Sequence, residues 1–169
     1  MKNIGTVENT PDSLRTRSSI AADSIIGLRF FTVYGPWGRP DMAIYIFANK
    51  IINNEPIQVF NHGKMKRDFT YIDDIIGGIV SSISHNYKCE VFNLGNSRSE
   101  ELMDVVSFLE EKIGKKAIIQ FEPMQPGDVS NTWANIEKAQ QKLEFFPKTN
   151  LRSGINKFMD WYLDYSKIK

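Results

Sequence analysis

The sequence has little of the material from which disulfide-stabilised and metal-binding proteins are built. Its 169 residues include one cysteine, Cys89, and two histidines, with no CxxC pair and no HExxH. One cysteine cannot form an internal disulfide, which favours a reducing compartment such as the cytoplasm. So few cysteines and histidines also leave little to ligate a transition metal. We therefore expect a cytoplasmic protein without a metal site.

A surplus of one charge sign and a long hydrophobic run are missing too. Lys and Arg number 21 and Asp and Glu number 20, a net charge of +1, whereas nucleic-acid-binding domains usually carry a clear basic surplus. No apolar run approaches the ~20 residues of a membrane span, and the N-terminus lacks the apolar stretch of a signal peptide. We expect neither nucleic acid nor a membrane as a partner.

The chain divides into an irregular beginning and a patterned remainder. Residues 1–24 hold few apolar residues and show no period, which predicts a weakly ordered lead-in; a short helix at 18–24 is the alternative. After them, strand and helix patterns alternate, which makes the fold class α/β. The predicted strands are 25–34, 57–60, 67–72, 91–95 and 117–121. The predicted helices are 42–53, a helix from 73, a helix ending at 113, 135–144 and 152–167.

The sequence also predicts three local details of these helices. Asp41 is predicted to cap the helix that begins at Met42. The helix from Asp73 carries an apolar stripe that indicates its buried face, made of Ile75, Ile76, Ile79, Val80 and Ile83. Gly77 and Gly78 lower the propensity of that helix, and we interpret them as sites of close packing against another backbone.

Four segments together resemble the extended short-chain dehydrogenase/reductase superfamily in order and spacing. They are GLRFFTVYGP at 27–36, KMKRDFTYIDDI at 64–75, FNLGN at 92–96 and QPGDV at 125–129. GRPDMA at 38–43 is similar to UDP-glucuronate 4-epimerases, which belong to the NAD-dependent nucleotide-sugar epimerase/dehydratases. The resemblance implies that 25–169 is a nucleotide-sugar-binding domain with residual strands of a truncated Rossmann sheet. It also implies that 1–24 is a remnant of the cofactor domain.

The resemblance also implies residues that contact a UDP-sugar. Arg67 corresponds to a pyrophosphate contact, and its planar guanidinium suits phosphate oxygens; an ion pair with Asp68 or Asp73 is the alternative. Phe60 would cover the uracil ring, unless it belongs to the core. Ile57 and Gln58 match positions whose backbone contacts uracil in relatives. Asp128 would bind the ribose hydroxyls, unless it serves only as a turn or cap residue.

Two further residues belong to the sugar end of the implied site. Thr32 stands where galactose-type epimerases have asparagine and glucuronate epimerases have threonine, which matches a sugar with a C6 carboxylate. Arg39 would pair with that carboxylate; bracing its own loop is the alternative. No catalytic residue is predicted in this chain.

The residues for redox chemistry are missing from these 169 positions. The family binds NAD through a GxxGxxG turn, which the sequence lacks. Its catalytic Tyr-x-x-x-Lys pair has one match, from Tyr165 to Lys169, which follows the predicted substrate domain and is interpreted as coincidental. We therefore expect a truncated NAD-dependent UDP-glucuronate 4-epimerase-like protein that binds UDP-sugar, holds no cofactor of its own and is inactive alone.

Three other interpretations stay open at this point. The chain could be a UDP-sugar-binding pseudoenzyme. It could be a remnant that binds a partner, or that self-associates through exposed sheet edges. Within the enzyme branch, another nucleotide-sugar epimerase or a 4,6-dehydratase is the alternative.

Overall fold

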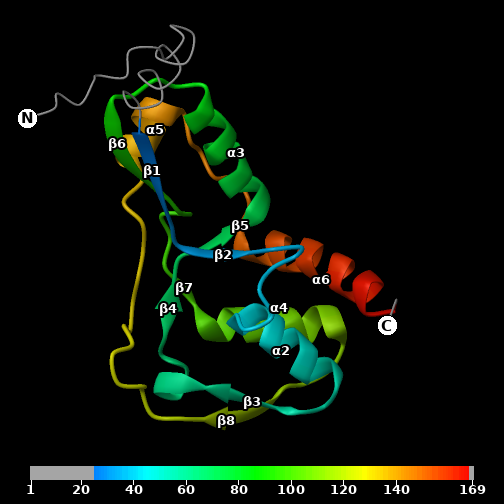
Figure 1. Ribbon diagram of the computed structural model, residues 1–169. Coiled ribbons are helices and arrows are strands. Elements are labelled where there is room, and N and C mark those ends of the chain that lie inside the picture. Colours follow the sequence, from blue (N-terminus) through cyan, green and yellow to red (C-terminus); the bar gives the residue numbers. More distant parts are fainter. Residues whose placement is uncertain (1–24, 168–169) are drawn as a thin grey trace, which may run out of the picture.

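The computed structural model describes residues 25–167. The predicted lead-in at 1–24, and the alternative helix at 18–24, lie outside the described residues. Parallel strand pairs and helices alternate over the described range, which confirms the α/β class (Figure 1).

One end of the molecule is a two-stranded parallel sheet with helices on one face. β1 (Ile25–Phe30) pairs with β6 (Cys89–Leu94), and α3 (Ile72–Ile83) and α5 (Glu137–Leu143) pack against the pair (Figure 1). Phe92 and Leu94 project toward these helices and are fully buried, because alternate residues of a strand face the same side. This cluster forms a small core of its own.

The predicted strand 25–34 is in fact two strands that belong to different sheets. At Phe31 the chain leaves β6, and β2 (Thr32–Tyr34) pairs in parallel with β5 (Phe69–Tyr71). The Phe31 N–H donates to the Leu94 carbonyl, and the Thr32 N–H donates to the Asp68 carbonyl. Thr32 therefore stands where the chain passes from one sheet to the other.

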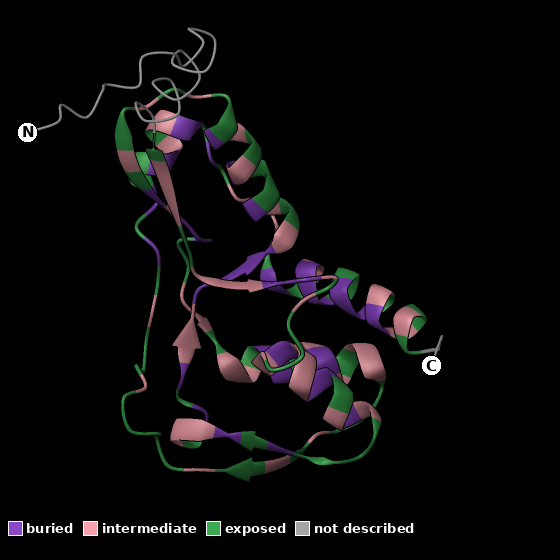
Figure 2. Ribbon diagram, viewed as in Figure 1, coloured by how far each residue is buried: buried purple, intermediate pink, exposed green. Residues whose placement is uncertain are grey.

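The larger core lies below β2 and β5 among three helices. α2 (Ala43–Ile52), α4 (Leu102–Ile113) and α6 (Leu151–Lys167) bury their apolar faces there, and Figure 2 shows buried segments on all three. β3 (Pro56–Val59) pairs in parallel with β8 (Ile118–Phe121) beside these helices. The 3-10 helix η1 (Phe60–Gly63) follows β3, and β4 (Lys66–Arg67) pairs antiparallel with β7 (Glu100–Glu101).

The prediction for the helix that ends at 113 is confirmed. Val105, Val106 and Leu109 are buried against the large core at the spacing of one helical face. Gly114 ends the helix in the left-handed conformation, with φ 73°.

Three local predictions are wrong. Asp41 does not cap α2: the helix begins at Ala43 with no side-chain cap, and Asp41 instead pairs with Arg39. Phe60 does not continue the strand at 57–60, because η1 begins there. The predicted strand 67–72 is interrupted at Asp68, whose side chain is turned into the interior.

The apolar stripe predicted to be buried on α3 is largely exposed. Ile75 is buried, but Ile76, Val80 and Ile83 are 48, 58 and 78% exposed. The helix is rotated so that Gly78 and Ser82 share the buried face with Ile75. Ile79 is half-buried against the small core, so only Ile76, Val80 and Ile83 form an apolar face that is left exposed within the described range.

The interpretation of the two glycines in α3 also needs correction. A Cβ on Gly77 would have no heavy atom within 4 Å, so nothing packs closely there. A Cβ on Gly78 would lie 2.8 Å from Leu94 Cδ1 and 2.9 Å from Phe145 Cδ2. Gly78 is therefore closely packed, but against side chains and not against a backbone.

Candidate functional site

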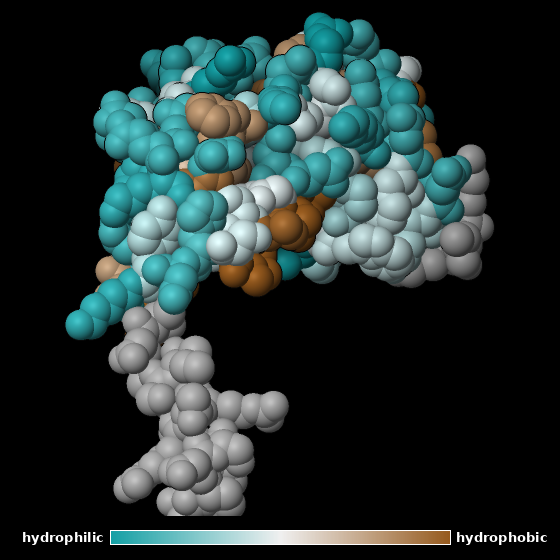
Figure 3. Space-filling model, turned by 90° about the horizontal axis from the view of Figure 1, so that it is seen from above, coloured by the Kyte–Doolittle hydropathy of each residue, from teal (hydrophilic) through white to brown (hydrophobic). Residues whose placement is uncertain are grey.

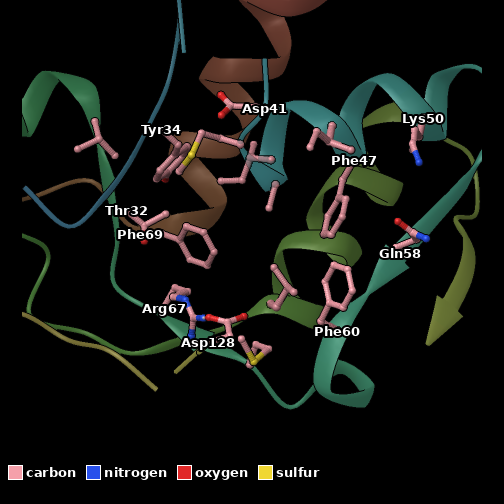
Figure 4. Close-up of a pocket in the computed structure, with 17 residues that line it drawn as sticks. Thr32, Tyr34, Asp41, Phe47, Lys50, Gln58, Phe60, Arg67, Phe69 and Asp128 are labelled. Carbon is pink, nitrogen blue, oxygen red and sulfur yellow. The ribbon is translucent and has the colours of Figure 1, made fainter. Parts of the chain in front are cut away.

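A cavity of about 360 Å³ opens between α2, the end of β2, β3 with η1, and the β4–β5 segment (Figure 4). Five of the seven predicted site residues line it: Thr32, Gln58, Phe60, Arg67 and Asp128. These residues lie far apart in the sequence, on different strands and loops. The fold therefore gathers most of the predicted site at one place.

Arg67 and Asp128 form an ion pair at one end of the cavity. The Arg67 Nη2 donates to Asp128 Oδ1 at 2.7 Å, and the Arg67 Nη1 donates to the carbonyl of Lys66 at 2.9 Å. The two side chains are 20% and 32% exposed, so both remain accessible from the cavity. A guanidinium uses only part of its donor fork in one such contact, which leaves donors for a further anion.

The ion pairs considered from the sequence are not the ones that form. Asp68 is fully buried and accepts hydrogen bonds from Thr70 and three backbone N–H groups, and Asp73 lies 3.9 Å from Lys157. Arg67 pairs with Asp128 instead. Two residues that were each predicted to contact the ligand therefore form an ion pair with one another.

Asp68 is the supporting residue that the sequence did not reveal. Its carboxylate accepts from the N–H groups of Asn96 at 2.6 Å, Ser97 at 2.9 Å and Ala134 at 2.8 Å. These bonds fasten the chain before β5 to the loop after β6 and to the segment that follows Asp128. A buried carboxylate needs such a set of donors, and here they hold together the elements that carry Arg67 and Asp128.

The other end of the cavity is aromatic. Phe60 is half-buried at the start of η1, and Phe47 of α2 projects toward the same space (Figure 4). Gln58 points outward from β3 and lines the cavity. Ile57 faces the opposite side of that strand and is fully buried in the large core, because neighbouring strand residues alternate. Its backbone alone remains for a ligand.

Thr32 and its neighbours form the wall between these two ends. Thr32 and Phe69 lie side by side in the β2–β5 pair and both line the cavity. Tyr34 also lines the cavity: its hydroxyl donates to the carbonyl of Leu151 at 3.3 Å, and burial raises the pKa of this phenol well above its usual value. Tyr34 therefore stays neutral and has a structural contact.

Arg39 is not among the residues that line the cavity. Its guanidinium is 76% exposed and makes two hydrogen bonds to Asp41, from Nε to Oδ1 at 3.0 Å and from Nη2 to Oδ2 at 2.5 Å. This pairing raises the pKa of Arg39 and lowers the pKa of Asp41. Asp41 does line the cavity, so the pair brings a carboxylate to its rim.

Several lining residues on or beside α2 were not predicted, because the sequence of this helix shows no polar stripe that would indicate a binding face. Asp41, Met42 and Lys50 lie at the two ends of α2, and Phe47 lies between them. From the sequence, α2 reads as apolar on most of its surface. Only its packing against β3 reveals which part faces the cavity.

The described residues offer little for a metal ion or for a dinucleotide. Between residues 25 and 167 no cluster of three His, Cys, Asp or Glu side chains could hold a metal ion, and no helix is long and apolar enough to span a membrane. A dinucleotide needs consecutive free N–H groups at a glycine-rich turn before a helix. The β2–α2 turn has Gly35 and Gly38, but Pro36 and Pro40 have no N–H and the Gly38 N–H already donates to Gly35. The β2–α2 turn therefore does not fit the pyrophosphate of NAD.

Comparisons with known proteins show which family the chain is similar to. Residues 16–95 match the NAD dependent epimerase/dehydratase family. The chain is 43% identical to Protein CapI of Staphylococcus aureus over 83% of its own length and 48% of that protein. It is 42% identical to UDP-glucuronate 4-epimerase 2 of Arabidopsis thaliana, covering 90% of this chain and 39% of the relative.

The fold has solved relatives as well. The UDP-glucuronic acid 4-epimerase of Bacillus cereus, in complex with UDP-glucuronic acid and NAD, matches with a TM-score of 0.77 and 37% identity. The match covers 82% of this chain and 45% of that structure. Over part of its length the chain is therefore similar to the NAD-dependent epimerase/dehydratase family. Within that family its similarity is to UDP-glucuronate 4-epimerases, and it spans about half the length of the curated relatives that it matches.

Proposed function

We propose that this chain binds UDP-sugars in the described cavity, with UDP-glucuronic acid as the first candidate. In this proposal residues 25–169 are the nucleotide-sugar-binding half of an epimerase-type protein. The observation that carries it is the accessible Arg67–Asp128 pair at one end of a cavity whose other end is aromatic. Charge at one end and flat apolar surface at the other suit a nucleoside diphosphate, which has the same two parts.

Each part of the ligand has a matching residue in this proposal. The guanidinium N–H groups of Arg67 that are not bonded to Asp128 or Lys66 donate to the diphosphate, and such charge-assisted hydrogen bonds are strong. Asp128 accepts from the ribose hydroxyls. Phe60 stacks on the uracil ring, and Gln58 and the backbone of Ile57 form hydrogen bonds with the polar edge of the base.

The sugar then extends toward Thr32, past the rim where Asp41 lies. A C6 carboxylate at this rim would compete with Asp41 for the two-pronged contact of Arg39. Because that pair is exposed, exchange of one carboxylate for another costs little. This step explains how Arg39 could serve the site although it does not line the cavity without ligand.

Titration calorimetry tests the proposal. The protein is expected to bind UDP-glucuronic acid, and Arg67→Met is expected to weaken binding about 30-fold, which corresponds to ~2 kcal/mol for a lost charge-assisted contact. Arg152→Met is the control, because Arg152 pairs with Glu111 on the surface, away from the cavity. Absence of heat at millimolar ligand, or equal effects of the two variants, would contradict the proposal.

Binding in this proposal orients the substrate and does not itself convert it. In the resembled family NAD supplies hydride transfer. The sequence lacks the GxxGxxG turn for that cofactor, and no pair with the Tyr-x-x-x-Lys spacing is found among the described residues that line the cavity, so we propose that this chain alone does not epimerise UDP-glucuronic acid. Measurable conversion by the purified chain with added NAD would contradict this.

A second candidate function, self-association, is favoured by exposed apolar residues at the other end of the molecule. Ile25 and Val91 project from the sheet face opposite α3 and α5, and β1 and β6 have no further strand beside them within the described range. Figure 3 looks onto this end and shows hydrophobic side chains at its surface. Two-stranded sheets are rarely stable alone. Sedimentation velocity tests this candidate: a second copy docked on this face predicts a dimer, and a monomer at high concentration excludes it.

A further inference from the structure

A second basic side chain, Lys50, lines the cavity, and the proposed function assigns no role to it. Lys50 lies in the last turn of α2, is half-buried and lines the cavity. Arg67, the other basic residue of the lining, is paired with Asp128. Between residues 25 and 167 the Lys50 ammonium has neither an ion pair nor a hydrogen bond. A half-buried lysine whose ammonium has no partner on a cavity wall favours a ligand that presents an acceptor there.

Lys50 lies at the aromatic end of the cavity. Figure 4 shows it beside Gln58 and Phe47, with Phe60 between this group and the Arg67–Asp128 pair. A nucleotide whose phosphates sit at Arg67 would therefore bring its base, and not its charged part, toward Lys50.

We propose that Lys50 is a specificity-determining residue that selects uracil over cytosine by donating a hydrogen bond to the O4 carbonyl oxygen of the base, where cytosine has an amino group. This proposal rests on the proposed function, since it requires a uridine nucleotide in the cavity. An ammonium can only donate. Uracil carries two carbonyl oxygens, whereas cytosine has an amino group in place of one of them. A cytosine in the same pose would oppose two donors, which leaves both unpaired in a partly desolvated place.

Gln58 cannot make this distinction by itself. Its side-chain amide has both a donor and an acceptor, and rotation of the amide satisfies either base. The fixed donor on Lys50 is therefore the group that discriminates between the two pyrimidines.

The test compares UDP with CDP by titration calorimetry on the whole chain. Lys50→Met keeps most of the apolar stem and removes the donor. We expect it to weaken UDP binding about 10-fold while CDP binding changes less than about twofold, the loss of one hydrogen bond from a charged donor. Lys50→Arg keeps a donor and should retain the preference for UDP. Lys88→Met, an exposed lysine next to β6, is the matched control and should change neither affinity.

Each other outcome overturns the proposal in a recognisable way. Equal weakening of UDP and CDP in Lys50→Met would assign Lys50 to the diphosphate. An unchanged UDP affinity would mean that Lys50 does not touch the ligand. Wild-type protein that binds UDP and CDP equally well would leave the proposed function standing and remove this inference. Wild-type protein that binds no UDP would remove both.

Discussion

The carboxylate of Asp68 accepts a hydrogen bond of 2.8 Å from the backbone N–H of Ala134, 66 residues further along the chain. The same carboxylate also holds the N–H groups of Asn96 and Ser97. One fully buried side chain thus ties together three segments, and two of them lead directly to Arg67 and Asp128. The charged end of the cavity depends on this connection.

Asp68→Asn is therefore expected to destabilise the protein by about 3 kcal/mol, because the new amide group turns a donor toward backbone donors in the interior. Urea denaturation measures the change. Asp104→Asn is the control: Asp104 is exposed in the first turn of α4, where loss of its charge costs less than about 1 kcal/mol. Equal stability of Asp68→Asn and wild type would contradict the role given to this carboxylate.

The adjacent glycines of α3 predict two substitutions of opposite sign. Gly77→Ala should stabilise the protein by up to about 1 kcal/mol, since alanine is the better helix former and its Cβ has open space. Gly78→Ala should destabilise it by about 1–3 kcal/mol, since its Cβ would press on Leu94 and Phe145. Thermal unfolding of the two variants gives the comparison. A shift of the melting temperature in the same direction for both would contradict the packing of Gly78 against Leu94 and Phe145.

Phe60 is expected to serve the ligand more than the fold. It is half-buried, lines the cavity and lies outside both buried clusters. Phe60→Ala should weaken UDP binding about 10-fold, within the ~1–3 kcal/mol measured for stacking of a base on an aromatic ring. The melting temperature should change little. Phe146→Ala, an exposed aromatic in the segment after α5, provides the control for both measurements. A large loss of stability with unchanged affinity would mean that Phe60 is a core residue and does not contact the ligand.

Glu90 gives the fold a predicted dependence on acid pH. Hydrogen bonds from Lys138 and then Lys142 of α5 lower the pKa of Glu90 below its ordinary value of 4.5. The unfolded chain therefore takes up the proton at a higher pH than the folded chain does. The stabilisation from Glu90 is complete above pH 4.5 and is lost as the pH falls through the lowered pKa.

Glu90→Gln tests this dependence. The variant should be less stable than wild type at pH 7, and the difference should shrink at pH 3. Urea midpoints at the two pH values, with and without salt, measure it. Because these side chains are at the surface, salt should reduce the difference at pH 7. A difference that is independent of pH would mean that the Glu90–lysine contacts contribute nothing.

Local periodicity predicted much of the fold, and the resemblance to nucleotide-sugar enzymes implied the candidate site residues. The class, the helix ending at Gly114 and the residues Thr32, Gln58, Phe60, Arg67 and Asp128 were all identified from the sequence, and the fold gathers those five around one cavity.

What the sequence could not predict depends on contacts between distant segments. The partner of Arg67 was expected among its neighbours and lies 61 positions away, in a loop that Asp68 fixes through Ala134. Burial of the α3 stripe was expected from its pattern. An amphipathic pattern shows that a face is apolar, but only the arrangement of the whole chain decides whether that face is covered.

The most direct test of the account is a titration of the isotope-labelled chain with UDP-glucuronic acid, followed by amide chemical shifts. We expect saturable changes concentrated at the cavity, at Thr32, Gln58, Phe60, Arg67 and Asp128, and the same changes without those at Thr32 when UDP replaces the sugar nucleotide. No change at millimolar ligand, or changes confined to β1 and β6, would contradict the claim that this cavity is a UDP-sugar site.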